Sequence, residues 1–206
     1  LEDAERSLRK TIELKPDFFK AHLNLGAVLK DLGKIKEAEI ACKKAINLNP
    51  NLFNSHFLLS SILIGQKKLE DAEISLRKTI ELKPDFSKAH SALGGLLREF
   101  GKLQEAEIST RKAIELNPNF ADTYSNLGII LQELGKQKEA ELLYKKAIKL
   151  NPNLADAHSN LGSVLKDLGK SNEAEIYLRK AIKINPHFAA AHSNLGNILQ
   201  NLGKLK

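Results

Sequence analysis

The 206-residue chain contains no methionine and no tryptophan, and its only cysteine is Cys42. A single cysteine excludes an internal disulfide and agrees with a reducing compartment. No apolar run approaches the roughly 20 residues that a membrane-spanning helix needs, and no signal-peptide pattern opens the chain. We therefore expect no membrane association, and a cytoplasmic location fits best. Because residue 1 is leucine, we also expect the parent protein to continue beyond this chain.

Proline is scarce, but its spacing is regular. The six prolines stand 34 residues apart, at Pro16, Pro50, Pro84, Pro118, Pro152 and Pro186. Histidine keeps the same spacing, with tyrosine in one slot, at His22, His56, His90, Tyr124, His158 and His192. A strict period of this length indicates a tandem repeat array rather than one or two globular domains.

Each repeat reads as two helices when its positions are numbered 1 to 34 from Phe19. Apolar or small residues at positions 7, 8 and 11, together with position 4, predict a first helix, and glycine at position 15 predicts its end. Apolar residues at positions 20, 24, 27 and 28 predict a second helix that ends before the proline at position 32. Aspartate or asparagine at position 33 predicts a side-chain cap for the next helix.

This pattern resembles the tetratricopeptide repeat over the whole chain. The resemblance rests on Leu-Gly at positions 7 and 8, alanine at 20, an apolar or aromatic residue at 24, alanine or threonine at 27 and proline at 32. Histidine at position 4 departs from the family, which more often has tryptophan there. The resemblance implies an all-α fold, a right-handed α-solenoid (superhelix) of helix-turn-helix units. We predict a lone second helix over 1–18, five full repeats over 19–52, 53–86, 87–120, 121–154 and 155–188, and a lone first helix over 189–206.

The recurring histidines raise the question of a metal or catalytic site, but their spacing favours packing. Successive copies lie one repeat apart, roughly 10 Å on the scale of helix packing, whereas a Zn–N bond is about 2 Å. The Gly-Lys pairs that follow the first helices lack a preceding strand and the rest of a phosphate-binding loop. Cys42 holds position 24, which we predict to be buried. We therefore expect no enzymatic activity, no metal site and no cofactor.

Basic pairs at positions 25 and 26 recur in every second helix, from Arg9-Lys10 to Arg179-Lys180. Such a row is one way to bind a phosphate backbone. A glutamate stands four residues before each pair, however, in the order that stabilises a helix by about 0.2–0.5 kcal/mol. The row also lacks aromatic residues on which bases stack. We favour a solvated outer face over nucleic-acid binding.

Asparagine recurs at position 6, in Asn24, Asn126, Asn160 and Asn194. On a helical wheel, positions 2, 5, 6, 9, 12 and 13 face away from the second helix. The family resemblance implies that this face lines a concave groove for extended peptides. A side-chain amide has a donor and an acceptor, which match a peptide backbone. The asparagines are either a backbone-binding ladder, which we favour, or tolerated surface residues. These rows also resemble the repeats of O-linked N-acetylglucosamine transferases, which implies substrate contacts through such a ladder.

The other residues of this face predict two different halves. In the first half an apolar patch is expected from Leu23, Phe53, Phe57, Leu58 and Ile64. Charges are mostly basic in the first three repeats, at Lys20, Lys30, Lys88 and Arg98, and mostly acidic in the next two, at Asp122, Glu133, Asp156 and Asp167. This polarity is suited to fixing the direction of a bound peptide and disfavours nucleic acid in the groove.

The repeat over 53–86 departs from its neighbours. Ser60 replaces the glycine of position 8, and Gln66-Lys67 replaces the Leu-Gly that ends the other first helices. We expect a local irregularity at this point of the chain.

Taken together, these patterns predict a protein-interaction scaffold that binds a peptide or partner segment in its groove. An alternative is the substrate-recruiting region of a larger glycosyltransferase, and a third is nucleic-acid binding on the basic outer face. The unpaired helices over 1–18 and 189–206 further predict head-to-tail self-association, a contact that need not close into a ring.

Overall fold

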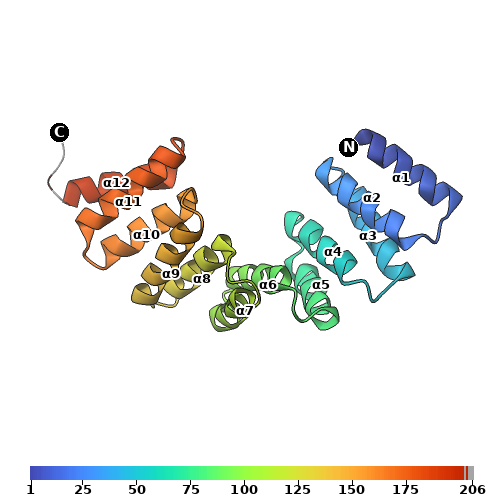
Figure 1. Cartoon of the computed structure of the whole chain (residues 1–206), viewed down its shortest axis with the longest axis horizontal. Helices are drawn as coiled ribbons and strands as arrows, with labels where there is room; N and C mark the ends of the chain where they lie inside the picture. The colour runs from blue at the N-terminus through green and yellow to red at the C-terminus, as the bar shows by residue number, and fades with distance from the viewer. Residues whose placement is uncertain (202, 204–206) are drawn as a thin grey trace. The chain divides into compact units, whose positions relative to one another are not determined.

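The computed structural model of the chain describes residues 1–201 and 203. These residues form twelve α-helices and no strand, in agreement with the predicted all-α solenoid (Figure 1). The chain divides into two compact units, Leu1–Leu96 and Leu97–Lys206. The end of the helix predicted over 189–206 lies outside the described residues.

The helices alternate along the chain as the repeat pattern predicts, a first helix of 13 residues being followed by a second helix of 14 in each full repeat. In chain order they are α1 (Glu2–Leu14), α2 (Phe19–Asp31), α3 (Ile35–Leu48), α4 (Phe53–Gly65), α5 (Leu69–Leu82), α6 (Ser87–Glu99), α7 (Leu103–Leu116), α8 (Ala121–Glu133), α9 (Gln137–Leu150), α10 (Ala155–Asp167), α11 (Ser171–Ile184) and α12 (Ala189–Asn201).

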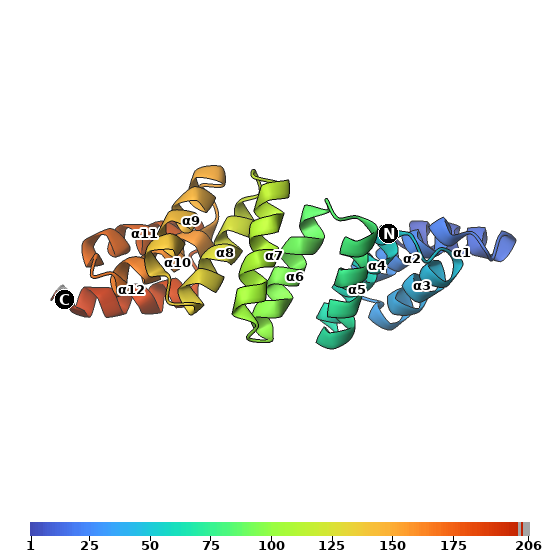
Figure 2. The same ribbon diagram turned by 90° about the horizontal axis from the view of Figure 1, so that it is seen from below.

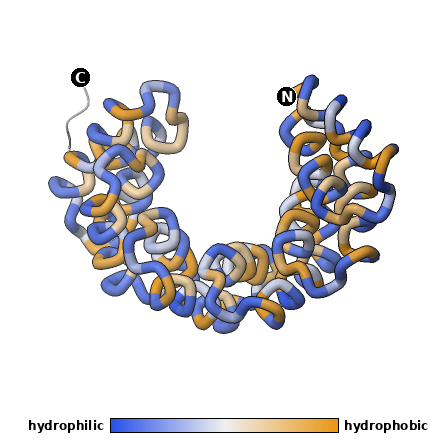
Figure 3. The backbone as a smooth tube through the Cα atoms, turned by 45° about the vertical axis from the view of Figure 1, so that its right-hand side comes forward, coloured by the Kyte–Doolittle hydropathy of each residue, from blue (hydrophilic) through white to orange (hydrophobic). Residues whose placement is uncertain are grey.

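Each first helix packs on the second helix that follows it, and each second helix packs on the next first helix. In the first unit α2 contacts α3, which contacts α4, and α4 contacts α5; in the second unit α8 to α12 follow the same order (Figure 2). Hydrophobic and hydrophilic residues are interspersed along the chain (Figure 3). In the second unit, the stacking of successive helices buries one core cluster with residues from each helix from α8 to α12.

Small residues let paired helices approach closely. Two glycines of position 8 leave no room for a side chain: a Cβ added to Gly128 would lie 2.6 Å from the ring of Tyr144, and one added to Gly162 would lie 2.6 Å from Leu178. Tyr144 and Leu178 are fully buried at position 24. In these two repeats the glycine of position 8 therefore packs directly against the large residue of position 24 on the second helix.

The glycine of position 15 ends the first helices as predicted. Gly33, Gly101, Gly135, Gly169 and Gly203 all adopt positive φ, the left-handed conformation that residues with a Cβ avoid. In the repeat over 53–86, Lys67 takes this conformation with φ of 59°. The irregularity predicted there is confined to the backbone of this turn, because α4 has the same 13 residues as its neighbours. Lys67, which stands where the other repeats have glycine, thus takes a strained backbone conformation.

The prediction that Asp or Asn at position 33 caps the next helix is wrong. The caps of α2, α4, α8 and α10 are Phe18, Leu52, Phe120 and Leu154, and none makes a side-chain cap hydrogen bond. Instead, asparagine at position 31 organises the turn. Asn151 accepts a hydrogen bond from the backbone N–H of Asn153 at 3.1 Å, and Asn49, Asn117 and Asn185 make the same contact in their turns.

Candidate functional site

The repeated histidines have a structural role. Nε2 of His22 lies 2.8 Å from the backbone oxygen of Pro16 in the preceding turn, and His56, His90, His158 and His192 make the equivalent bond to their prolines. Because a carbonyl oxygen only accepts, Nε2 donates. Tyr124 replaces the imidazole with its hydroxyl, which donates to Pro118 at 3.0 Å. Each side chain ties the first turn of a first helix to the loop before it, as the packing interpretation predicts.

Cys42 is buried, and its sulfur packs against Gly26. Burial raises the pKa of the Cys42 thiol to about 12, so the thiol stays protonated at neutral pH. A protonated, inaccessible thiol is unsuited to nucleophilic chemistry. Within the described part of the chain, no three His, Cys, Asp or Glu side chains gather in a way that would hold a metal ion.

The second helices carry an ion-pair network that goes beyond the predicted pairs within each helix. Glu39 accepts hydrogen bonds from Lys43 of its own helix at 2.6 Å and from Lys68 of the next repeat at 2.8 Å. Glu5, Glu107 and Glu141 bridge two basic residues in the same way. Sequence reasoning missed the second partner, the lysine that follows the turn at position 15. The network joins successive repeats, so many of these cations are already paired.

Two of the four asparagines of position 6 line one pocket in the second unit. A pocket of about 310 Å³ on the first-helix face, between α8 and α10, is lined by Asn126 and Asn160 together with Asp122 and Asp156. All four are residues that the sequence places on this face. None of the four is buried. Neither asparagine side chain makes a hydrogen bond within the described residues, so both amides are available to a ligand.

A second pocket of about 410 Å³ adjoins the first on the same face and shares Asn160 and Ile129 with it. Glu133, another predicted residue, also lines it. Sequence reasoning missed its other lining residues, Gln132 and Gln137. The side-chain oxygen of Gln137 is shielded from solvent and has no hydrogen-bond partner. The signal in the sequence for Gln137 was a glutamine at position 17, the first residue of the second helix.

The structure does not bring every predicted residue of the second unit into these pockets. Asn194 is half-buried on α12 and lines neither of them. Asp167 is exposed at the end of α10, 4.0 Å from its neighbour Lys166. In the first unit, Asn24 is exposed on α2, as are Lys20 and, on α6, Lys88, while Lys30 is half-buried.

The apolar patch predicted for the first unit is less exposed than expected, because all five of its residues are half-buried. The two phenylalanines are held by Phe86, which the prediction omitted: its ring centroid lies 5.2 Å from that of Phe53 and 4.9 Å from that of Phe57, both edge to face. Lys83 lies 4.8 Å over Phe53. Exposed large apolar residues instead recur at position 22 of the second helices, at Ile40, Ile74, Ile108, Leu142 and Ile176.

The predicted division of charge is modified at one point. Arg98 was assigned to the basic half and Glu133 to the acidic half, yet both belong to the second unit, where they lie 3.9 Å apart as an ion pair. The exposed carboxylates of the first pocket, Asp122 and Asp156, make no such pair within the described residues. The pocket between α8 and α10 is therefore lined by amides and free carboxylates.

The fold and this face define a class of proteins: α-solenoids of helix-turn-helix repeats that interact through the exposed faces of their helices. Sequence models of the tetratricopeptide repeat match residues 19–52, 53–86, 87–120, 110–141 and 155–188, and a model of the TPR repeat matches residues 130–169. Together the matches cover 19–188. The chain belongs to the tetratricopeptide-repeat family.

Solved structures share the fold. YrrB, described as a TPR protein with an unusual peptide-binding site, aligns with a TM-score of 0.74 and 21% identity over 96% of this chain and 98% of that chain. MamA aligns with a TM-score of 0.72 and 26% identity over 82% and 92%. A chain of the APC/C hetero-tetramer Cut9-Hcn1 aligns with a TM-score of 0.83 and 20% identity over 96% and 39%.

The descriptions of these three structures name no glycosyltransferase. No curated protein sequence matches the chain. Among the described residues, no helix is both long enough and apolar enough to cross a membrane.

Proposed function

We propose that the chain is a protein-interaction scaffold that binds an extended peptide on the first-helix face of its second unit. The observation that carries the proposal is the joint lining of one pocket by Asn126 and Asn160, two free amides one repeat apart. The chain has the fold of a protein described as peptide-binding, which supports a peptide as the ligand.

The chemistry of the pocket suits a peptide backbone with basic side chains. Each amide offers a donor and an acceptor, the two groups that a backbone presents in alternation. Asp122 and Asp156 stand one repeat apart beside the amides and add negative charge, with no ion-pair partner in the part of the chain that the structure describes. Lysine or arginine side chains flanking the bound backbone complement this charge, which favours binding in one direction.

Two further proposals follow from the sequence. A glycosyltransferase partner domain would use the same asparagine face for substrate recruitment, so it makes the same prediction for the pocket. Head-to-tail self-association has its own support in α12, where a Cβ on Gly196 would meet nothing within 4 Å, unlike its counterparts Gly128 and Gly162.

Nucleic acid is disfavoured as a ligand of the outer face, because many of the basic side chains on that face already form ion pairs.

The proposal is tested by selecting linear peptides from a random display library against the full chain and measuring their Kd. The double variant Asn126→Ala, Asn160→Ala is expected to bind about 30-fold more weakly, from roughly 1 kcal/mol for each lost hydrogen-bonding contact. The control Asn172→Ala removes an exposed asparagine of the same unit on the second-helix side. Selected peptides that bind the double variant as tightly as the unchanged chain would show that the ladder is not the site.

A further inference from the structure

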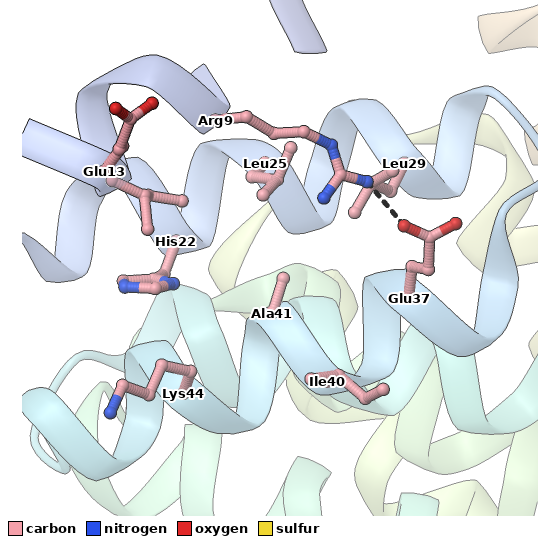
Figure 4. Close-up of a pocket in the computed structure, with 10 residues that line it drawn as sticks. Arg9, Glu13, His22, Leu25, Leu29, Glu37, Ile40, Ala41 and Lys44 are labelled. Carbon is pink, nitrogen blue, oxygen red and sulfur yellow. Dashed lines mark hydrogen bonds and ion pairs between the residues drawn. The ribbon is translucent and has the colours of Figure 1, made fainter. Parts of the chain in front are cut away.

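A cavity of about 570 Å³ opens in the first unit, on the second-helix side (Figure 4). It lies between α1 and α3, and residues of α2 form the rest of its wall. Its volume is in the range of small-ligand sites. The wall is mostly apolar, with Ile12 of α1, two leucines of α2 and Ala41 of α3, and His22 lies among them. Arg9 reaches from α1 to Glu37 of α3 and pairs with it at the mouth (Figure 4).

The same place in the repeat over 155–188 is filled by a ring. Ala41 holds position 23, where that repeat has Tyr177. The Tyr177 ring centroid lies 5.9 Å from that of His158, with 30° between the ring planes, and the Nζ of Lys180 lies 5.4 Å from the Tyr177 centroid. His158 is only 3% exposed. The Tyr177 ring thus has an imidazole and an ammonium group as neighbours.

The groups that hold Tyr177 have counterparts around the cavity. His22 and His158 share position 4, and each donates through Nε2 to a proline carbonyl, at 2.8 and 2.9 Å. Lys44 and Lys180 share position 26, and Ile12 and Ile148 share position 28. The cavity therefore has the same neighbouring groups as the Tyr177 ring, but position 23 carries only the methyl group of Ala41.

We propose that this cavity is a docking site for an aromatic side chain, a phenol of the tyrosine type, presented by a partner protein. The ring lies against His22 with Lys44 over its face, so that the positive charge meets the electron-rich face of the ring. The apolar wall buries the rest of the ring, which makes it the kind of aromatic anchor that dominates many interfaces. The site lies on the opposite side of a repeat from the proposed peptide face, and does not depend on that proposal.

The test is a titration of the full chain with N-acetyl-tyrosinamide, followed by the NMR signals of the His22 ring and the Ala41 methyl group. We expect saturable shifts at both, with a Kd on the order of 1 mM for so small a probe. N-acetyl-leucinamide, which lacks the ring, is expected to shift these signals at least tenfold less at equal concentration.

Two reciprocal variants sharpen the test. Ala41→Tyr reproduces the arrangement seen at Tyr177 and is expected to fold normally and to abolish the shift at His22. Tyr177→Ala opens the equivalent cavity and is expected to add a second saturable shift, at His158. Circular dichroism checks the folding of both variants, and if Tyr177→Ala unfolds, Ala41→Tyr alone decides.

The proposal is overturned if the His22 signals of the unchanged chain do not respond to N-acetyl-tyrosinamide, or if Ala41→Tyr leaves the response unchanged. An equal response to N-acetyl-leucinamide would overturn it as well, because the cavity would then lack a preference for an aromatic ring. A folded Tyr177→Ala chain with no response at His158 would contradict the equivalence of the two places, on which the choice of ligand rests.

Discussion

Single glycines control how closely the paired helices approach one another. Gly128 faces the fully buried ring of Tyr144, which lies 2.6 Å from where its Cβ would be, whereas a Cβ on Gly95 of α6 would meet nothing within 4 Å. Both glycines lie inside first helices, where alanine is favoured intrinsically by about 1 kcal/mol. The two sites therefore separate the effect of packing from the effect of helix propensity.

We expect Gly128→Ala to destabilise the chain by about 1–3 kcal/mol through overpacking, and Gly95→Ala to stabilise it by up to about 1 kcal/mol. Urea denaturation of both variants beside the unchanged chain measures the difference. If Gly128→Ala proved as stable as Gly95→Ala, the close contact with Tyr144 would not constrain the helix pair.

At the residue scale the sequence predicted conformations better than partners. The positive φ of Gly33 and the packing role of His22 both followed from their spacing, because a 34-residue period repeats the same local environment. Lys67 shows the limit: the turn geometry is imposed by its neighbours, so a lysine adopts the left-handed conformation despite its Cβ. Asp17 was wrongly assigned as the cap of α2, whose N-cap is Phe18 and makes no side-chain hydrogen bond. In the next turn the contact with the backbone comes instead from Asn49, at position 31.

At the scale of helices, the glutamate at position 21 joins one second helix to the next repeat. Hydrogen bonds from Lys43 and then Lys68 lower the pKa of Glu39 to about 2 from an ordinary 4.5. A carboxyl whose pKa is lowered by folding stabilises the folded state above its unfolded pKa. That stabilisation is lost as the pH falls from about 4.5 towards 2.

We therefore expect Glu39→Gln to be less stable than the unchanged chain by about 1–3 kcal/mol at pH 7, and the gap to close as the pH approaches 2. Thermal unfolding across this pH range measures it. Glu81→Gln is the matched control, because Glu81 pairs with Lys78 alone among the described residues and is 66% exposed, so its removal changes stability little. A gap for Glu39→Gln that did not depend on pH would rule out the carboxylate as its cause.

The periodicity predicted every helix of the described chain but not every contact between helices. The pairing of Glu39 with Lys43 was predicted because both lie on one helix, four residues apart. Its second bond, to Lys68, spans 29 residues and depends on how one repeat stacks on the next. Phe86 was missed for the same reason, since it lies in a loop outside the helical pattern that predicted Phe53 and Phe57.

At the scale of the whole molecule, the terminal helices expose surfaces that other repeats cover. On α12, His192 and Gly196 are exposed, while their counterparts His158 and Gly162 are buried. Leu14 of α1 is 76% exposed. We expect these surfaces to pair between chains at high concentration.

Light scattering over a concentration series measures this association. The average mass is expected to rise with concentration, and Gly196→Arg is expected to suppress the rise by obstructing the exposed side of α12 without disturbing its contacts within the chain. A constant monomer mass at all concentrations would contradict the prediction.

The candidate site on the first-helix face was predictable residue by residue, because helical periodicity assigns Asn126, Asn160, Asp122 and Asp156 to one side of their helices. Gln132 holds position 12, which the helical wheel also assigns to this face, although it was not selected as a site residue. Gln137 begins the second helix and lies outside the pattern of this face, so its place in the adjoining pocket depends on how α9 packs beside α8. The cavity beside Ala41 was missed as well. It lies beside a small side chain at position 23, and its likeness to a site for an aromatic ring becomes apparent only by comparison with Tyr177.

The most direct measurement of the central claim is NMR of the side-chain amide groups of Asn126 and Asn160 during titration with a selected peptide. We predict that the signals of both amides shift and saturate together. N-methylation of the backbone of the bound peptide segment is expected to abolish these shifts, because it removes the peptide N–H groups that donate hydrogen bonds to the asparagine side-chain oxygens. A peptide that binds equally well with its backbone methylated, or that leaves both amides unshifted, would contradict a ladder that reads the backbone.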